Sequence, residues 1–208
     1  MLGVAFSSDG KLLATAGGDS QGTLRLWNPA TGKPIRALLP ADTGPPGGGP
    51  PGGVTALAFS PDGKLLASAY ADGTVRLWNP ATGKPVDAPL PADFGTPDGV
   101  TAVAFSPDGK RLATVGGDGT AQLWNPATGK LVRAPLAADT GSAPGVTAVA
   151  FRRDGKLLAS AGADGTVRTW QVSLFADPYA ALCADVGPPT KANWTQYAPG
   201  EPQPSVCG

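Results

Sequence analysis

The stretch VTALAFSPDGKLLASAYADGTVRLWNPATGKPV, from Val54 to Val86, decides how this chain folds, because the chain contains it nearly four times. Further copies begin at Val100 and Val146, 46 residues apart, and a shortened first copy begins near Val4. A fixed period of this size indicates a repeat architecture, in which each unit buries its faces against its neighbours.

The first half of the copy predicts two strands. Residues 54–60 alternate small and large side chains, and this period of two predicts a strand with Val54 on the face of Ala56 and Ala58. Ser60-Pro61-Asp62-Gly63 predicts a tight turn, because Pro presets φ and Gly accepts a positive φ. Residues 65–69 then form a second strand, which ends before an Asp-Gly hairpin signal.

The second half predicts two more strands. In residues 74–78, Arg76 and Trp78 share one face, since alternate side chains of a strand point to opposite sides. Residues 79–83 form another turn, and residues 84–88 form a weaker strand whose two prolines confine it to a sheet edge. The unit is a four-stranded antiparallel meander of the kind that builds a propeller blade.

The copies share a DG turn, a T-x-R-L-W strand and one repeat length, and in these features the chain resembles the WD-repeat β-propeller family in its bacterial form. The resemblance covers about residues 3–172. It implies an all-β WD-repeat propeller segment of four antiparallel four-stranded blades, the last lacking its outer strand, with a short helical C-terminal cap. The expected domains are the blades at 1–172 (repeats about 1–39, 54–90, 100–136 and 146–172) and a helical, Pro-rich tail at 173–208.

Two departures from the family matter. The Asp that follows the family's Trp is Asn or Gln here, and the Gly-His pair that often opens a repeat is missing, so the family's complete hydrogen-bonded tetrad of His, Asp, Ser or Thr, and Trp cannot form. The resemblance still implies structural roles for the turn aspartates and the strand tryptophans: Asp72, Asp118, Asp164, Trp27, Trp78, Trp124 and Trp170.

The composition argues against enzymatic catalysis. Without histidine, the Ser/His/Asp and Cys/His forms of nucleophilic catalysis are excluded. The 16 basic and 16 acidic residues balance, which argues against a broad surface for nucleic acid or an anionic membrane. The repeated aspartates lie tens of residues apart and are interpreted as turn residues. We therefore expect no catalytic, cofactor or metal site, and a non-catalytic scaffold that binds other proteins.

The pattern LC-x₃-G…W-x₂-Y-x-P-G…C, from Leu182 to Cys207, resembles a tail found at the ends of actinobacterial WD-repeat proteins. Such proteins often carry a Ser/Thr kinase or a nucleotide-binding regulator upstream, so the alternative function is a C-terminal regulatory or sensor module of a larger signalling enzyme. Residues 177–185 and 190–197 each predict a short helix. Cys183 and Cys207 are candidates for a disulfide that staples the tail, and the alternative is two unrelated thiols.

The same features bear on localisation. No apolar run has the length of a membrane span, and the N-terminus shows no signal peptide, which favours the cytoplasm. A disulfide between Cys183 and Cys207 would instead favour an oxidising, extracytoplasmic compartment.

Four repeats are fewer than the seven blades usual in the family. We considered three alternatives: the chain is the C-terminal portion of a longer protein, two copies assemble into an eight-bladed ring, or the chain is a stable open arc or a small ring. Repeats this similar make intermolecular stacking physically reasonable.

Departures from the repeat mark candidate partner contacts. Tyr70 replaces a Gly found in the other copies, and Phe94 lies in a connection between repeats. With Asp42, Asp93 and Asp139 of those connections, they are predicted to form part of a partner-binding face. The alternative is that Tyr70 fills space and Phe94 tucks under its own loop.

Arginines recur two residues before the Trp, at Arg25, Arg76 and Arg168, with Gln122 in the third copy. Each arginine is expected to lie on a blade face and to pair with a turn aspartate or a carbonyl.

Overall fold

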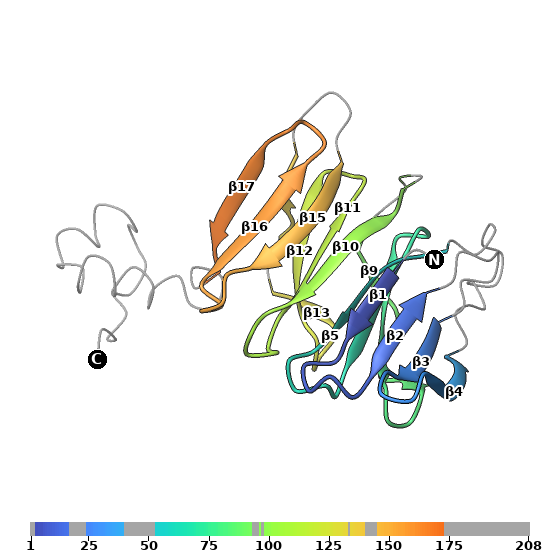
Figure 1. Ribbon diagram of the computed structural model, residues 1–208. Helices are drawn as coiled ribbons and strands as arrows, with labels where there is room; N and C mark the ends of the chain where they lie inside the picture. The colour runs from blue at the N-terminus through green and yellow to red at the C-terminus, as the bar shows by residue number, and fades with distance from the viewer. Residues whose placement is uncertain are drawn as a thin grey trace, which may run out of the picture.

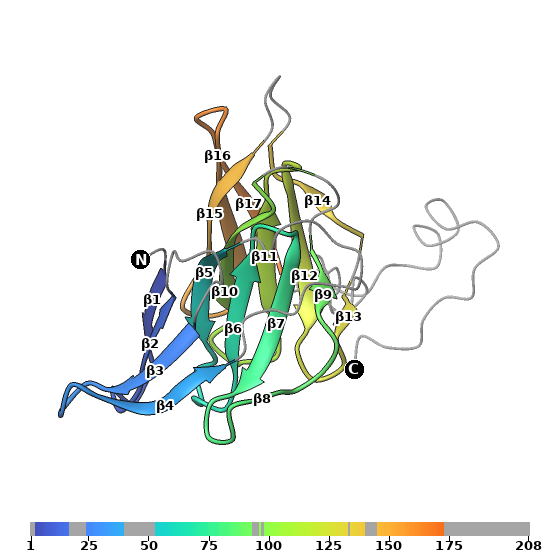
Figure 2. The same cartoon turned by 90° about the vertical axis from the view of Figure 1, so that its right-hand side faces the viewer.

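The computed structural model of the protein describes residues 3–16, 24–39, 53–92, 96, 98–132, 134–139 and 145–172. Within these residues all regular structure is β-strand, arranged in four antiparallel sheets (Figures 1 and 2). Each sheet is one repeat, and we number them blades 1 to 4. The helical cap predicted for residues 173–208 lies outside the described residues.

The strands follow one another across each blade in chain order, from the innermost to the outermost. Blade 1 contains β1 (Gly3–Phe6), β2 (Leu13–Ala16), β3 (Leu24–Asn28) and β4 (Lys33–Leu39). Blade 2 contains β5 (Val54–Phe59), β6 (Leu66–Tyr70), β7 (Thr74–Asn79), β8 (Lys84–Pro85) and β9 (Leu90–Pro91). Blade 3 contains β10 (Val100–Phe105), β11 (Leu112–Gly116), β12 (Thr120–Asn125), β13 (Lys130–Leu131) and β14 (Leu136–Ala137). Blade 4 contains β15 (Val146–Phe151), β16 (Leu157–Gly162) and β17 (Val167–Gln171).

The outer strand differs between blades: in blade 1 it is the seven-residue β4, and in blades 2 and 3 it is two short pieces. In blade 2 it is split into β8 and β9, both of which pair with β7. Proline cannot donate a ladder hydrogen bond, so Pro85 and Pro89 limit the strand to two short pieces. In blade 4 the described residues hold three strands, and the segment after Val172, where an outer strand would follow, lies outside the described residues.

One prediction about the innermost strand is wrong. The ladder between β5 and β6 shifts register between Val54 and Ala56, which is the signature of a β-bulge. The extra residue places Val54 in the same apolar cluster as Leu57 and Phe59, whereas Ala56 and Ala58 pack into the next cluster. Val54 therefore lies on the face opposite to the one predicted.

Each blade has two unlike faces. We call the face turned toward the preceding blade the leading face and the other the trailing face. Leading faces carry large side chains, and trailing faces carry alanines with Val or Leu. In blade 2 the buried leading-face residues are Val54, Leu66, Tyr70 and Trp78, and the buried trailing-face residues are Ala67, Ala69, Val75 and Leu77. Each core thus forms between a large face and a small one.

The blades stack in chain order, from the blue sheet of β1 to the orange sheet of β17 (Figure 1). Neighbouring innermost strands contact each other: β1 contacts β5, β5 contacts β10, and β10 contacts β15. Two side-chain hydrogen bonds reinforce this inner wall, because Thr55 donates to the carbonyl of Val100 and Thr101 donates to that of Val146. The four blades form an arc.

Candidate interaction surfaces

The DG turns of successive blades lie along one rim of the arc, and we call this rim the DG end. In blade 2 the Asp72 carboxylate accepts hydrogen bonds from the Thr74 N–H at 2.9 Å and from its hydroxyl at 2.7 Å. Gly73 has φ of 83°, a left-handed conformation that a side chain would strain. Asp118 and Asp164 repeat this arrangement in blades 3 and 4, so the three aspartates cap turns.

The connections between blades run along the same end. Ala92, which follows β9, donates its N–H to the carbonyl of Gly73 at 2.9 Å. Ala138, at the same place after β14, donates to the carbonyl of Gly119 at 2.8 Å. Turn and connection are therefore held together by backbone hydrogen bonds.

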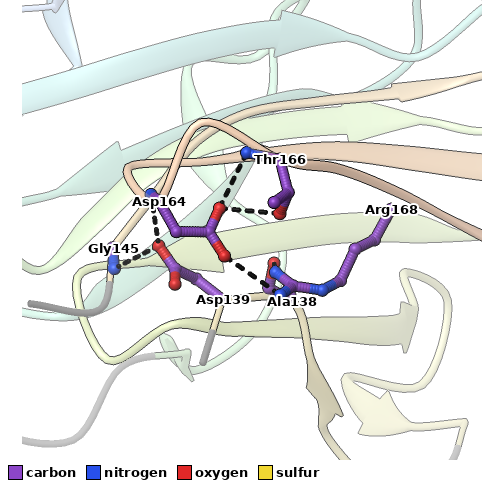
Figure 3. A network of polar contacts seen from close by, with 6 residues as sticks. All are labelled: Ala138, Asp139, Gly145, Asp164, Thr166 and Arg168. Atoms are coloured by element: carbon purple, nitrogen blue, oxygen red, sulfur yellow. Dashed lines mark hydrogen bonds and ion pairs between the residues drawn. The ribbon is translucent and has the colours of Figure 1, made fainter. Parts of the chain in front are cut away.

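Asp139 ties the connection after blade 3 to the turn of blade 4 (Figure 3). One carboxylate oxygen, Oδ2, accepts from the N–H of Gly145 and from the N–H of Asp164, each at 3.2 Å. The residue is 5% exposed, so a partner has little access to it. We predicted Asp139 as a partner contact, and its burial and its bonds assign it a structural role instead.

In blades 3 and 4, the side chain two positions before the strand Trp bonds to the connection that precedes its own blade. Arg168 donates from Nη1 to the carbonyl of Ala138 at 2.5 Å and pairs through Nη2 with Asp164 at 3.0 Å (Figure 3). Gln122 donates to the carbonyl of Ala92 at 3.0 Å. The expectation that these arginines pair with a turn aspartate or a carbonyl is confirmed for Arg168. Gln122 makes the same kind of bond to a carbonyl as Arg168 does, and the sequence did not reveal this because the residue is Gln and not Arg.

Tyr70 does not lie on the surface. It is 1% exposed, and its ring packs in the core between blades 1 and 2. Its hydroxyl oxygen accepts from Ser68 Oγ at 3.2 Å, and the guanidinium of Arg76 lies 5.1 Å from the ring centroid. The prediction of a docking aromatic does not fit this burial, which favours the alternative that Tyr70 fills space. The other predicted contacts, Phe94, Asp42 and Asp93, lie outside the described residues.

Each Trp of blades 1 to 3 donates its indole N–H to a hydroxyl on the neighbouring strand. The bonds are Trp27 to Thr15 at 2.8 Å, Trp78 to Ser68 at 2.8 Å and Trp124 to Thr114 at 3.0 Å. This half of the family's tetrad survives without histidine. In blade 4 the equivalent Ser160 hydroxyl is buried without a hydrogen bond among the described residues.

The opposite end, which we call the lysine end, is made of S-x-D-G-K turns and N-P-A-T-G-K turns. In the first kind, Ser60 donates to Asp62 at 2.7 Å, and the pKa of that carboxyl is lowered by this bond and by the backbone N–H of Lys64. In the second kind, Asn79 Oδ1 accepts from the N–H of Ala81 at 3.0 Å. Asn thus caps the turn where the family has Asp.

The lysine end and the DG end carry opposite charge. The lysine end exposes one lysine from nearly every turn: Lys11, Lys33, Lys64, Lys84, Lys110, Lys130 and Lys156. The described loops of the DG end contain no lysine or arginine and hold five acids: Asp72, Asp98, Asp118, Asp139 and Asp164. A net charge of zero therefore conceals a separation of charge along the blades. The Gly-Lys pair that closes each turn was the signal for it in the sequence.

A groove of about 610 Å³ opens at the lysine end between blades 2 and 3. Its walls are the two S-P-D-G turns and the Asn125-Pro126-Ala127 turn, with Leu65 between them. The lining includes three prolines and two aspartates, and the Ser60 hydroxyl there is bonded to Asp62 within its own turn. Over the described residues there is also no cluster of three metal-ligating side chains and no helix able to cross a membrane.

Comparison with known families agrees with this architecture. A family model described as "WD domain, G-beta repeat" matches residues 2–28, 47–79, 90–125 and 134–171, which together make up more than half of the chain. The chain belongs to the WD-repeat family. WD repeats indicate a protein-interaction scaffold, and proteins of this family are generally non-catalytic.

Similar proteins share only short stretches with it. Human apoptotic protease-activating factor 1 is 44% identical over 81 residues, which cover 38% of this chain and 6% of that protein. Chicken WD repeat-containing protein 1 is 37% identical over 78 residues, 36% of this chain and 11% of that protein. Fission-yeast periodic tryptophan protein 2 homolog is 36% identical over 81 residues, 39% of this chain and 8% of that protein. The matches thus span about a tenth or less of these relatives.

Proposed function

We propose that this chain is a non-catalytic scaffold that recruits partner proteins through its DG end. The observation that carries the proposal is the combination found there: turns and connections are fixed by hydrogen bonds, and the described loops hold acids but no lysine or arginine, with Arg168 of β17 paired to Asp164. Loops held by a rigid framework are common binding sites, because they lose little conformational entropy on association.

The charge of the rim suggests the kind of partner. Asp72 and Asp98 are exposed at this end, and Asp118 is partly exposed. A basic surface is complementary to such a rim, and complementary charge speeds association and selects the partner. Phe94, Asp42 and Asp93 belong to the connections of this end in the sequence, and we keep them in the proposed contact set.

Asp98→Lys tests the proposal without breaking a turn. The side chain is exposed and lies in the connection before β10. The variant is used as bait beside the wild type in affinity capture from the source organism, and captured proteins are then titrated individually. We expect at least tenfold weaker binding of the true partner, and binding that weakens with salt.

The matched control is Asp87→Lys. Asp87 is also exposed but lies in the segment between β8 and β9, on the outer edge of blade 2. Both variants change the net charge by the same amount, so only position differs. Phe94→Ala is the second test, since a lost aromatic anchor should weaken the same partner. Equal binding of all variants would show that the DG end is not the docking surface.

A second candidate is a regulatory module of a larger signalling enzyme. It is favoured by the small share of each relative that the matches span, 6% for the human apoptotic protease-activating factor, because similar repeats there form part of much longer proteins. The test is to read the whole open reading frame that encodes this chain. A kinase or nucleotide-binding domain on the same polypeptide would support the regulatory module, and its absence would favour the scaffold.

A further inference from the structure

The two outer faces of the arc differ from all the faces inside it. On the leading face of blade 1, Val4 is 59% exposed and Phe6 is 61% exposed. On the trailing face of blade 4, Val167 is 71% exposed. Its equivalents Val75 and Ala121 are 0% exposed, because the next blade covers them. Apolar side chains this open mark an association surface.

The two faces are also complementary in shape. Each of the three interfaces between blades joins a leading face of large side chains to a trailing face of small ones. Blade 1 leaves a large leading face open, with Trp27 already fixed by its hydrogen bond to Thr15 at 2.8 Å. Blade 4 leaves a small trailing face open, with Ala148 and Ala150 exposed beside Val167. The open faces are thus the two halves of one more interface of the kind already formed three times.

We propose that a second copy of this chain covers both faces, so that blade 4 of each copy packs on blade 1 of the other. The contact continues the stacking of the blades, with Val4 and Phe6 of one copy against the alanines and Val167 of its partner. Two such junctions join eight blades, which is within the four to eight blades of ring propellers. A head-to-tail contact closes into a ring when its rotation permits, and forms open filaments otherwise.

The second copy is favoured over an unrelated protein by the repeat itself. Blade 4 also presents the hydroxyl of Thr147, whose equivalents Thr55 and Thr101 donate to the innermost strand of the next blade. Thr147 keeps the bond within its own blade, to the carbonyl of Ala161 at 3.3 Å, which Thr101 also makes to the carbonyl of Val115 at 3.1 Å. A following blade of the same repeat would supply the carbonyl acceptor on its innermost strand that the equivalents of Thr147 use.

The test is the mass of the 208-residue chain in solution, measured by light scattering over a dilution series. We expect a species of twice the 20.7 kDa chain mass. Val4→Glu and Val167→Glu should each abolish it, because every junction uses one of each face. Val86→Glu is the control, since this valine is 42% exposed on the outer edge of blade 2 and should leave the dimer intact.

The pattern of the variants separates the alternatives. A dimer lost with Val4→Glu but kept with Val167→Glu would mean that two blade 1 faces pair, and would overturn the head-to-tail contact. A monomer at all concentrations, or a ladder of masses that grows with concentration, would overturn the closed pair. Circular dichroism of each variant must match the wild type, and equal spectra identify a lost dimer as a lost contact. The DG end is not part of these faces, so this result does not decide the proposed function.

Discussion

The N–H of Asp164 donates to the carboxylate of Asp139 at 3.2 Å, across 25 residues of chain. This bond joins the connection that leaves blade 3 to the turn that caps blade 4, and Arg168 closes the same network through Ala138 and Asp164 (Figure 3). Two neighbouring blades are therefore fixed to each other by polar contacts as well as by their apolar core.

Asp139→Ala should destabilise the chain by about 1–3 kcal/mol, because it leaves the N–H groups of Gly145 and Asp164 without the acceptor they use now. Urea unfolding followed by tryptophan fluorescence measures the change. Asp98→Ala is the control, because this aspartate is exposed and should change stability by less than about 0.5 kcal/mol. Equal losses in the two variants would contradict the structural role of Asp139.

Acid should weaken the turn of blade 4. Hydrogen bonds from the hydroxyl and the backbone N–H of Thr166, and then the pairing with Arg168, lower the pKa of Asp164 from its ordinary 3.8 to about 2. A carboxyl whose pKa is lower in the folded state stabilises that state above its unfolded pKa. This contribution is present above about pH 4 and is lost as the pH falls toward 2.

Thermal unfolding between pH 5 and pH 2 measures this effect. Asp164→Asn should lower stability at pH 7 and flatten the loss of stability in acid. Thr166→Val removes the hydroxyl donor, 2.7 Å from the carboxylate, and should move the acid transition to higher pH. An acid transition unchanged in both variants would show that other carboxyls set it. Asp9, Asp62, Asp108 and Asp154 also have lowered pKa values, and so a residual acid transition is expected.

The fold was predictable because the information is local and repeated. Period-two alternation gives the strands, and the turn glycines sit where the backbone has positive φ, as at Gly63 and Gly83. The bulge after Val54 was not predictable, because it depends on hydrogen-bond register, which side-chain alternation does not record. It reversed the expected face of that residue.

The candidate sites were harder to predict, because they depend on residues far apart in the chain. Tyr70 differs from the glycine of other copies, and difference alone suggested a surface contact. Its burial follows from packing against blade 1, which no single repeat reveals. The carboxylate of Asp139 likewise bonds to a turn in the next repeat. The charge separation was visible in the order of the residues but not in the net charge.

Ser68→Ala should cost about 1–3 kcal/mol, because the indole N–H of the buried Trp78 loses the acceptor that lies 2.8 Å away. The same substitution at Ser160, the equivalent position in blade 4, is the matched control. Its buried hydroxyl makes no hydrogen bond among the described residues, so Ser160→Ala should be neutral or slightly stabilising. Chemical denaturation of both variants checks the difference, and a larger loss at Ser160 would contradict it.

Gly162→Ala should destabilise blade 4, although the backbone there does not require glycine. A Cβ atom at this position would lie 2.6 Å from a carboxylate oxygen of Asp164 and 3.0 Å from one of Asp139. Overpacking of this kind costs about 1–3 kcal/mol. Here it would also disturb the hydrogen bonds that the carboxylates of Asp139 and Asp164 accept from backbone N–H groups. The equivalent position in blade 2 holds Tyr70, so a large side chain is compatible with this place in the blade when its neighbours differ.

Gly145→Ala is the matched control for that experiment. Among the described residues its Cβ atom would meet only the Cβ of Ala163 at 3.8 Å, an ordinary contact, and alanine keeps the N–H that donates to Asp139. Both variants add one methyl group to a glycine beside the same network, so their difference isolates the effect of crowding the carboxylates. We expect the urea midpoint to fall for Gly162→Ala and to stay within error for Gly145→Ala. A fall of equal size in both would mean that chain entropy or folding of the connection, and not the packing of the aspartates, controls the stability of this end of the blade.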